Sequence, residues 1–152
     1  MKKIAALVLA GAFAAGAAQA QSGAPASAAT PSGAAGDAQA AAAVQAANRW
    51  LALMDAGQAG ESWDAAAPIL QAAVTRASWI DIGKSVRAPL GEVKSRKQAS
   101  AVFTRTLPGV PEGEYVVIQY ASDFAGRAGV VETVVPMRLP DGSWKVTTYR
   151  LR

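Results

Sequence analysis

The chain has 152 residues and contains neither histidine nor cysteine. This composition excludes Ser-His-Asp triads, Cys-His nucleophiles, disulfides and the ordinary His/Cys zinc site. Its 15 basic and 11 acidic residues give a net charge of +4, spread along the chain, whereas proteins that bind nucleic acid concentrate basic side chains on one face. We therefore expect no nucleic-acid partner, and we assign no catalytic residue, metal ligand or cofactor-binding residue.

Residues 1–20 have the pattern of a secretory signal peptide. Lys2 and Lys3 form a positive start, residues 4–16 are apolar, and Ala18-Gln19-Ala20 offers the small residues that signal peptidase accepts, so cleavage is expected after Ala20. The apolar stretch is shorter than a membrane span and rich in Ala and Gly. We expect a periplasmic or secreted protein without a stable membrane anchor after cleavage.

Residues 21–37 are expected to be a flexible linker. The segment is rich in Ala, Gly, Ser and Pro, with no aromatic residue and no charge before Asp37, so it has little apolar surface to offset the entropy cost of ordering. We find no internal repeat. Residues 38–152 are then expected to form one domain.

Helical periodicity begins at about residue 37. Apolar side chains recur at spacings of three and four residues, and Gly57 stands where a C-terminal cap is expected; the stripe consists of Val44, Ala47, Leu51 and Met54. A second helical stretch has Ser62 as its expected N-cap. Pro68 should divide it into two short pieces, because proline removes a backbone donor and clashes with the preceding turn.

A third helix is predicted from Thr75, its expected cap, to Pro89-Leu90-Gly91. Its inward face should carry Trp79, Ile82 and Val86. The indoles of the three helical stretches are interpreted as core rather than as a stacking platform for sugars or bases; these are Trp50, Trp63 and Trp79.

Beyond Gly91 the period changes to two and the composition shifts to Val, Thr, Tyr, Phe and Trp, which favour strands. Four strands are predicted, at residues 92–107, 114–122, 130–139 and 143–151, with turns at 108–113, 126–129 and 140–142. Short connections join antiparallel neighbours. The predicted fold is therefore α+β, with about three N-terminal helices on one face of a four-stranded antiparallel meander.

Alternation suggests which side chains of the last two strands face the core. The inward set is expected to be Val131, Thr133, Val135 and Met137 in the third strand, and Trp144, Val146 and Thr148 in the fourth. Glu132 and Tyr149 would then lie on the opposite face. Pro136 should mark a sheet edge or a bulge, since it cannot donate to the ladder.

An ordered set of short segments resembles one known family. The segments are Ala47-Asn48-Arg49-Trp50-Leu51, Glu61-Ser62-Trp63-Asp64, Arg87-Ala88-Pro89-Leu90-Gly91, Lys94-Ser95-Arg96, residues 113–120, Glu132-Thr133-Val134 and residues 141–146. Together they resemble the exported bacterial proteins grouped as domain-of-unknown-function family 4019, over residues 43–152. A Gly before the tyrosine is more usual in that family than the Thr147-Thr148-Tyr149 found here. The resemblance implies an exported location and this architecture but no reaction. The layout is also similar to cystatin-like and NTF2-like folds.

Five residues form the candidate ligand or interaction surface: Arg96, Tyr115, Tyr120, Glu132 and Tyr149. Glu132 is a single acid within an apolar strand. It could orient a ligand, or pair with Arg96 or Arg105 on a neighbouring strand. A solvated pair of this kind contributes well under ~1 kcal/mol, and alternation favours that interpretation.

The leading functional hypothesis is a non-catalytic module of the cell envelope that binds a partner protein or a small ligand. One alternative is an isomerase or hydratase in which an Asp base faces a Tyr donor; the candidate groups are Asp55, Asp64 and Asp81 with Tyr115, Tyr120 and Tyr149. Another is a self-associating homodimer that uses the uncovered face of the sheet. The basic cluster Lys94, Arg96 and Lys97 either binds anionic envelope components or protects a strand edge with charge.

Overall fold

The computed structural model describes residues 31–152, so the predicted signal peptide and the first ten residues of the predicted linker lie outside the described residues. Helices come first and strands follow. The helices are α1 (Pro31–Asp55), α2 (Ala59–Asp64), α3 (Pro68–Ala73) and α4 (Arg76–Arg87); the strands are β1 (Val93–Thr104), β2 (Tyr115–Phe124), β3 (Arg127–Arg138) and β4 (Trp144–Leu151).

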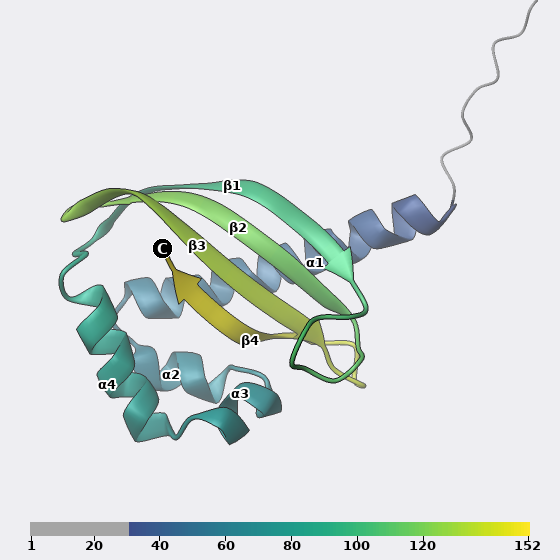
Figure 1. The fold of residues 1–152 in the computed structure, drawn as a ribbon, viewed down its shortest axis with the longest axis horizontal. Coiled ribbons are helices and arrows are strands. Elements are labelled where there is room, and N and C mark those ends of the chain that lie inside the picture. Colours follow the sequence, from purple (N-terminus) through teal and green to yellow (C-terminus); the bar gives the residue numbers. More distant parts are fainter. Residues whose placement is uncertain (1–30) are drawn as a thin grey trace, which may run out of the picture.

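The four strands form one antiparallel sheet in the order β1-β2-β3-β4, as the meander prediction required. The sheet curves over α1, while α2, α3 and α4 gather beside α1 on the same side of the sheet (Figure 1). The α+β fold is therefore confirmed. Four helices replace the predicted three because Pro68 starts a separate helix, as its effect on the backbone led us to expect.

Helix α1 begins earlier than the sequence suggested. It starts at Pro31, so residues 31–37 of the predicted flexible linker are helical. Proline is well tolerated in the first turn of a helix, and the alanines that follow have the highest helix propensity. Helix propensity and continuity with the buried part of α1 therefore favour the helix, although this segment has few apolar side chains beyond alanine.

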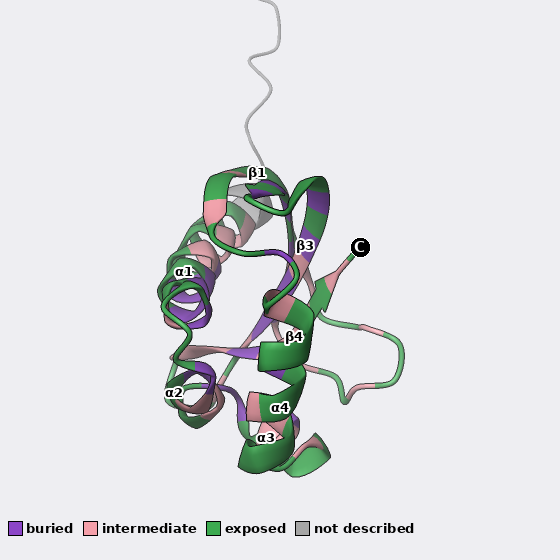
Figure 2. Cartoon of the chain, turned by 90° about the vertical axis from the view of Figure 1, so that its left-hand side faces the viewer, coloured by how far each residue is buried: buried purple, intermediate pink, exposed green. Residues whose placement is uncertain are grey.

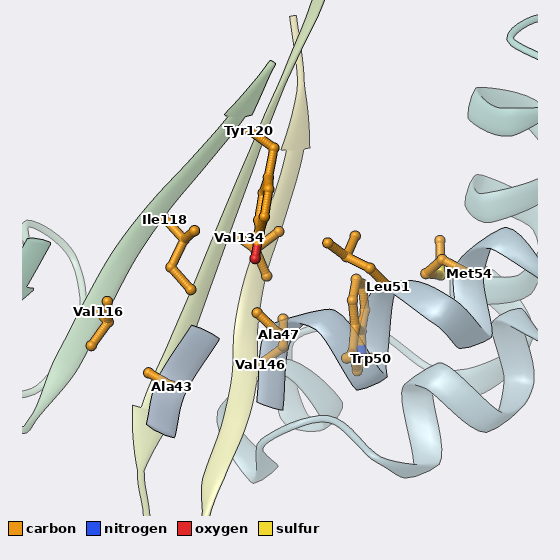
Figure 3. Close-up of a cluster of buried hydrophobic side chains, with 10 residues drawn as sticks. All are labelled: Ala43, Ala47, Trp50, Leu51, Met54, Val116, Ile118, Tyr120, Val134 and Val146. Atoms are coloured by element: carbon orange, nitrogen blue, oxygen red, sulfur yellow. The ribbon is translucent and has the colours of Figure 1, made fainter. Parts of the chain in front are cut away.

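The main core lies between α1 and the sheet. The stripe predicted from periodicity is confirmed: Ala47, Leu51 and Met54 are buried, with Trp50 beside them. These side chains point at Val116, Ile118 and Tyr120 of β2, at Val134 and at Val146, as Figure 3 shows. Gly57 ends α1 with a positive φ of 73°, which confirms the expected cap.

All three helical tryptophans are at least partly buried and donate their indole N–H. Trp50 donates to the backbone oxygen of Ser62 at 2.7 Å, and Trp79 to the Ser62 hydroxyl at 3.0 Å. Trp63 donates to the carbonyl of Val74 at 2.8 Å. The prediction that Ser62 is an N-cap is therefore wrong. Ser62 lies fully buried inside α2, which begins three residues earlier, and its backbone oxygen and hydroxyl each accept a hydrogen bond from an indole. Thr75 does cap α4, accepting from the Ser78 amide at 3.2 Å.

The turn between β2 and β3 is tighter than predicted. Phe124 pairs with Arg127, so the connection is Ala125-Gly126 rather than residues 126–129. A Cβ on Gly126 would lie 2.5 Å from the carbonyl oxygen of Pro89, and the Gly126 amide donates to Leu90 at 2.8 Å. The absence of a side chain at residue 126 thus lets the turn pack against the segment that follows α4.

The predicted inner face of β3 is wrong by one residue. Val130, Glu132, Val134 and Pro136 are the residues that face the helices, and all are fully buried, whereas Val131 is 40% exposed on the other face. The side chains of β3 do alternate, but its two alternating sets have comparable apolar content. Burial of an unpaired carboxylate is costly, and the partners that allow Glu132 to be buried come from other strands.

The predicted faces of β4 are wrong beyond Val146. The pairs Val135 with Thr148 and Pro136 with Val146 leave Thr147 as an extra residue in β4, a bulge that reverses the alternation. Val146 is buried as expected, but Tyr149 rather than Thr148 shares its face and packs against Trp50. Pro136 stands at this bulge in an interior strand, which confirms that part of the prediction.

Helix α4 keeps much of its surface open to solvent (Figure 2). Ile82 and Val86, predicted to point inward, are 49% and 41% exposed. Trp79 and Gly83 instead provide the contacts of α4 with α1 and α2. Ile82 and Val86 therefore remain open to solvent. Among the described residues, none of the helices is long and apolar enough to cross a membrane.

Candidate functional site

The polar centre of the molecule is Glu132, whose side chain is completely buried in β3. Its carboxylate accepts three hydrogen bonds: from Arg96 Nε at 2.7 Å, from the Ser122 hydroxyl at 2.6 Å and from the Tyr149 hydroxyl at 2.7 Å. Glu132 is therefore not the solvated cross-strand pair expected from alternation. A carboxylate with this many donors is accommodated in a core that would otherwise exclude it.

Arg96 extends the site from the sheet to the helices. It comes from β1, reaches Glu132 across the intervening strand β2, and also binds Asp55 at the end of α1. Its Nη1 lies 2.7 Å from Asp55 Oδ2 and its Nη2 lies 3.0 Å from Asp55 Oδ1. The guanidinium thus forms a fork with one carboxylate and a single bond with another, which fixes its plane.

Arg87 at the end of α4 completes the network. Its Nη2 donates to Asp55 Oδ1 at 2.6 Å. Its guanidinium carbon lies 5.3 Å from the centre of the Phe124 ring and 5.8 Å from that of Tyr149, within the range of cation–π contacts. Its Nε is buried and has no hydrogen-bond partner among the described residues.

The charges in this network shift the titration of its members. Partial burial alone would raise the pKa of Asp55, but the hydrogen bonds and charges of Arg96 and Arg87 outweigh burial and lower that pKa. Burial likewise disfavours the charged form of Arg96, yet Asp55 and Glu132 together raise the pKa of Arg96 above its ordinary value. Burial and the adjacent Glu132 raise the pKa of Tyr149. The phenol therefore stays protonated, as a donor to Glu132 must.

The structure brings three of the five candidate residues into direct contact: Arg96, Glu132 and Tyr149. Tyr120 lies beside them, opposite Glu132 in the sheet, and donates to the Asn48 side chain at 2.8 Å. Burial raises the pKa of Tyr120 to about 12. Tyr115 is elsewhere: it is fully buried at the start of β2 and donates to the Pro111 carbonyl at 2.7 Å.

Sequence reasoning missed three members of the network: Ser122, Arg87 and the pairing role of Asp55. No local pattern connects them, since Asp55 and Arg96 are 41 residues apart. One signal was present. Glu132 is a single carboxylate in an otherwise apolar strand, and such a residue requires partners if it is buried. Of the two proposed partners, Arg96 is the one that pairs with Glu132, while Arg105 lies 3.8 Å from Glu114.

The Asp and Tyr groups of the catalytic hypothesis do not form a pair among the described residues. Asp55 is bound by two arginines, Asp64 forms an exposed ion pair with Arg76, and Asp81 is exposed. The carboxylate that accepts a hydrogen bond from a tyrosine is that of Glu132, and the Glu132 side chain is fully buried. The arrangement that the hypothesis requires, an Asp within hydrogen-bond reach of a Tyr in a pocket, is therefore not formed.

A groove runs between α4 and the end of β4, on the solvent side of this network. It encloses about 270 Å³, and its apolar walls include Trp79, Ile82, Val86 and Leu151. Arg87 lines the groove and also lines a second hollow of about 300 Å³ that includes Asp55 and Gly91. Arg87 is therefore the member of the buried network that lines both surface hollows.

The basic cluster on β1 divides between two environments. Lys94 and Lys97 are exposed, with Lys94 3.0 Å from Glu92, whereas Arg96 points inward to the buried network. The three cations therefore do not form one patch. Because β1 is an edge strand, the two exposed lysines are in the position where charge discourages unwanted pairing.

Comparison with protein families matches residues 46–149 to the family described as "Protein of unknown function (DUF4019)". Neither the curated proteins nor the solved structures gave a match, so the likeness to cystatin-like and NTF2-like folds stays a prediction. The matched segment runs from α1 to near the end of β4 and includes the four charged residues of the network, Asp55, Arg87, Arg96 and Glu132. The chain therefore belongs to the DUF4019 family.

Proposed function

We propose that the protein is a ligand-binding module of the cell envelope and that the groove between α4 and β4 is its binding surface. One observation carries the proposal: Ile82 and Val86, two large apolar side chains of α4, are 49% and 41% exposed on the wall of a hollow of about 270 Å³. Apolar hollows with a few polar groups are the usual form of small-molecule sites, with volumes of about 300–1,000 Å³.

Arg87, a polar residue of the groove lining, is held in place by a chain of contacts. Arg87 is fixed by Asp55, which Arg96 in turn holds in place, and Arg96 is anchored by the buried Glu132. A side chain held by such a chain of contacts loses little conformational freedom when a ligand binds, so less binding energy is lost to ordering. This supports binding rather than a chemical step as the role of the network.

Binding can be tested by following backbone amide NMR signals while a small amphiphile, decanoate or decanol, is added. We expect shifts at Ile82, Gly83 and Leu151, which line the groove, and none at Val102 on the opposite face of the sheet. Shifts spread over both faces, or none with either probe, would refute the proposal.

A matched pair of variants tests the location. Val86→Trp fills the groove with a larger side chain and should abolish the shifts. Val102→Trp places the same side chain on the outer face, where residue 102 is 57% exposed, and should leave binding unchanged. Equal binding by both variants would place the site elsewhere.

We also propose that the protein acts after export, in the periplasm or outside the cell. The support is the sequence of residues 1–20, with its two lysines, apolar stretch and Ala18-Gln19-Ala20. Mass spectrometry of protein from the periplasmic fraction should give a chain that begins at Gln21. A chain recovered only in the cytoplasm and retaining Met1 would contradict it.

A further inference from the structure

We infer that the ligand of the α4–β4 groove carries a single anionic group, of the carboxylate class, on a straight apolar chain. The inference rests on the proposed function and specifies its ligand. It is drawn from the unused donors of Arg87, the volume of the groove and the short free edge of β4.

Arginines are the charged residues of the groove lining. Among the described residues that form it, three are arginines, Arg87, Arg150 and Arg152, and none is acidic. Arg150 pairs with Thr133 and Arg152 with Val131, so their side chains leave β4 on the outer face of the sheet. The arginine that a negative group of a ligand can meet from the groove side is therefore Arg87, which is already paired with Asp55.

The Arg87 guanidinium has N–H donors that are not used within the described residues. A guanidinium has five N–H donors, and the only hydrogen bond that the Arg87 guanidinium makes to a described residue is the one to Asp55. Its side chain is 13% exposed, so part of it is accessible from the groove. A carboxylate is the acceptor that matches the planar fork of an arginine best.

The volume limits the apolar part of the ligand. The groove encloses about 270 Å³, just below the usual range of about 300–1,000 Å³ for small-molecule sites, so it has room for a short chain. Trp79, Ile82 and Val86 line it on the α4 side and Leu151 on the β4 side. A short straight chain fits, and a folded partner protein does not enter.

An added peptide strand fits the edge of β4 less well. The amide of Ala67 already donates to the Val146 carbonyl at 2.8 Å, which occupies that part of the edge. Arg152 exchanges two hydrogen bonds with Val131, so by alternation only Tyr149 and Leu151 direct backbone groups away from β3. Two residues give too short a ladder for strand addition, which favours the small amphiphile.

The test compares probes that differ only in the head group. Titration calorimetry of the full-length protein with decanoate and with decanol should give at least about tenfold tighter binding of decanoate at low salt, decreasing at high salt. Shortening decanoate to octanoate should weaken binding by about fourfold for each methylene removed.

The outcomes separate this inference from the proposed function. Equal binding of decanol and decanoate would overturn the inference and leave the groove as the binding site, whereas binding of neither would overturn both. If an apolar hexapeptide bound more tightly than decanoate, the inference of an amphiphilic ligand would be overturned in favour of a peptide that adds a strand to β4.

A pair of nearly isosteric variants isolates the charge. Ile82→Asp and Ile82→Asn remove the same apolar contact, but only the first places a negative charge on the groove wall. We expect decanoate to bind Ile82→Asp at least about fivefold more weakly than Ile82→Asn, with no difference for decanol. Two arginines serve as controls: Arg150→Gln, on the outer face of β4, and Arg105→Gln, on an exposed residue outside the groove, should leave decanoate binding unchanged. Equal decanoate affinity for Ile82→Asp and Ile82→Asn would overturn the inference.

Discussion

Arg96 Nε lies 2.7 Å from Glu132 Oε1, although the two residues belong to strands that do not touch, β1 and β3. Their side chains meet on the inner face, over β2, where Ser122 adds a third polar group. The same arginine continues to Asp55 at the end of α1. One guanidinium therefore ties three strands of the sheet to the helices, and the position of Arg87 in the groove depends on it.

Replacement of Glu132 should destabilise the protein strongly. Glu132→Ala leaves Arg96 without its buried partner and should cost about 3–5 kcal/mol of the free energy of unfolding. Glu132→Gln keeps the shape but removes the charge, and should cost about 1.5–3 kcal/mol. Urea unfolding measures both. Glu92→Gln, at an exposed ion pair, should change stability by less than about 1 kcal/mol; equal effects at residues 92 and 132 would contradict a buried network.

Asp55 should make stability depend on acid pH. Its pKa is lowered in the folded state from the ordinary value of 3.8, so the unfolded chain binds its proton first as pH falls. The stabilisation is therefore complete above about pH 4 and is lost as the pH falls through the lower, folded value. Asp55→Asn should cost about 1.5–3 kcal/mol at neutral pH, and its difference from wild type should shrink below pH 4. A constant difference from pH 7 to pH 2 would contradict the pairing.

Tyr120 should make stability depend on alkaline pH in the opposite direction. Its pKa is raised from 10.0 to about 12 in the folded state, mainly by burial. The unfolded chain releases the phenolic proton first, so stability is full below pH 10 and falls between pH 10 and 12. Tyr120→Phe should reduce that loss, as measured by urea unfolding at both pH values. An unchanged slope in the variant would show that the phenol is not buried.

The start of α1 can be tested with one substitution. Gly36 lies in the helix with open space around it, so Gly36→Ala should stabilise the protein by about 0.5–1 kcal/mol. If residues 31–37 were the flexible linker first expected from composition, the same change would have no effect on thermal unfolding. Gly109→Ala, at a positive φ of 80°, should be destabilising instead.

Periodicity predicted the elements well and the faces of the last two strands poorly. The stripe of α1, the break at Pro68, the cap at Thr75 and the meander follow from local chemistry, which a sequence displays directly. The bulge at Thr147 inserts one residue and inverts the face of Tyr149. Neither Thr147 nor its neighbours differ in residue type from an ordinary strand, so only Pro136 hinted at it.

The site was predicted as a set of residues but not as a geometry. Arg96, Glu132 and Tyr149 were predicted as parts of a ligand or interaction surface, with Glu132 and Tyr149 on the outer face, yet they meet on the inner face. Arg87 and Asp55 come from helix ends where charged residues are ordinary, so nothing in the sequence distinguished them. The exposed faces of Ile82 and Val86 were missed because helical periodicity identifies an apolar stripe without showing whether another element covers it.

The central claim is that the groove between α4 and β4 binds an apolar chain with its carboxylate at Arg87. The most direct measurement is of intermolecular nuclear Overhauser effects between decanoate and the isotope-labelled protein. We predict contacts from the terminal methyl and methylene protons to Trp79, Ile82 and Val86, with the carbon next to the carboxylate nearest Arg87. Contacts confined to the outer face, at Val102 or Val131, would contradict the account.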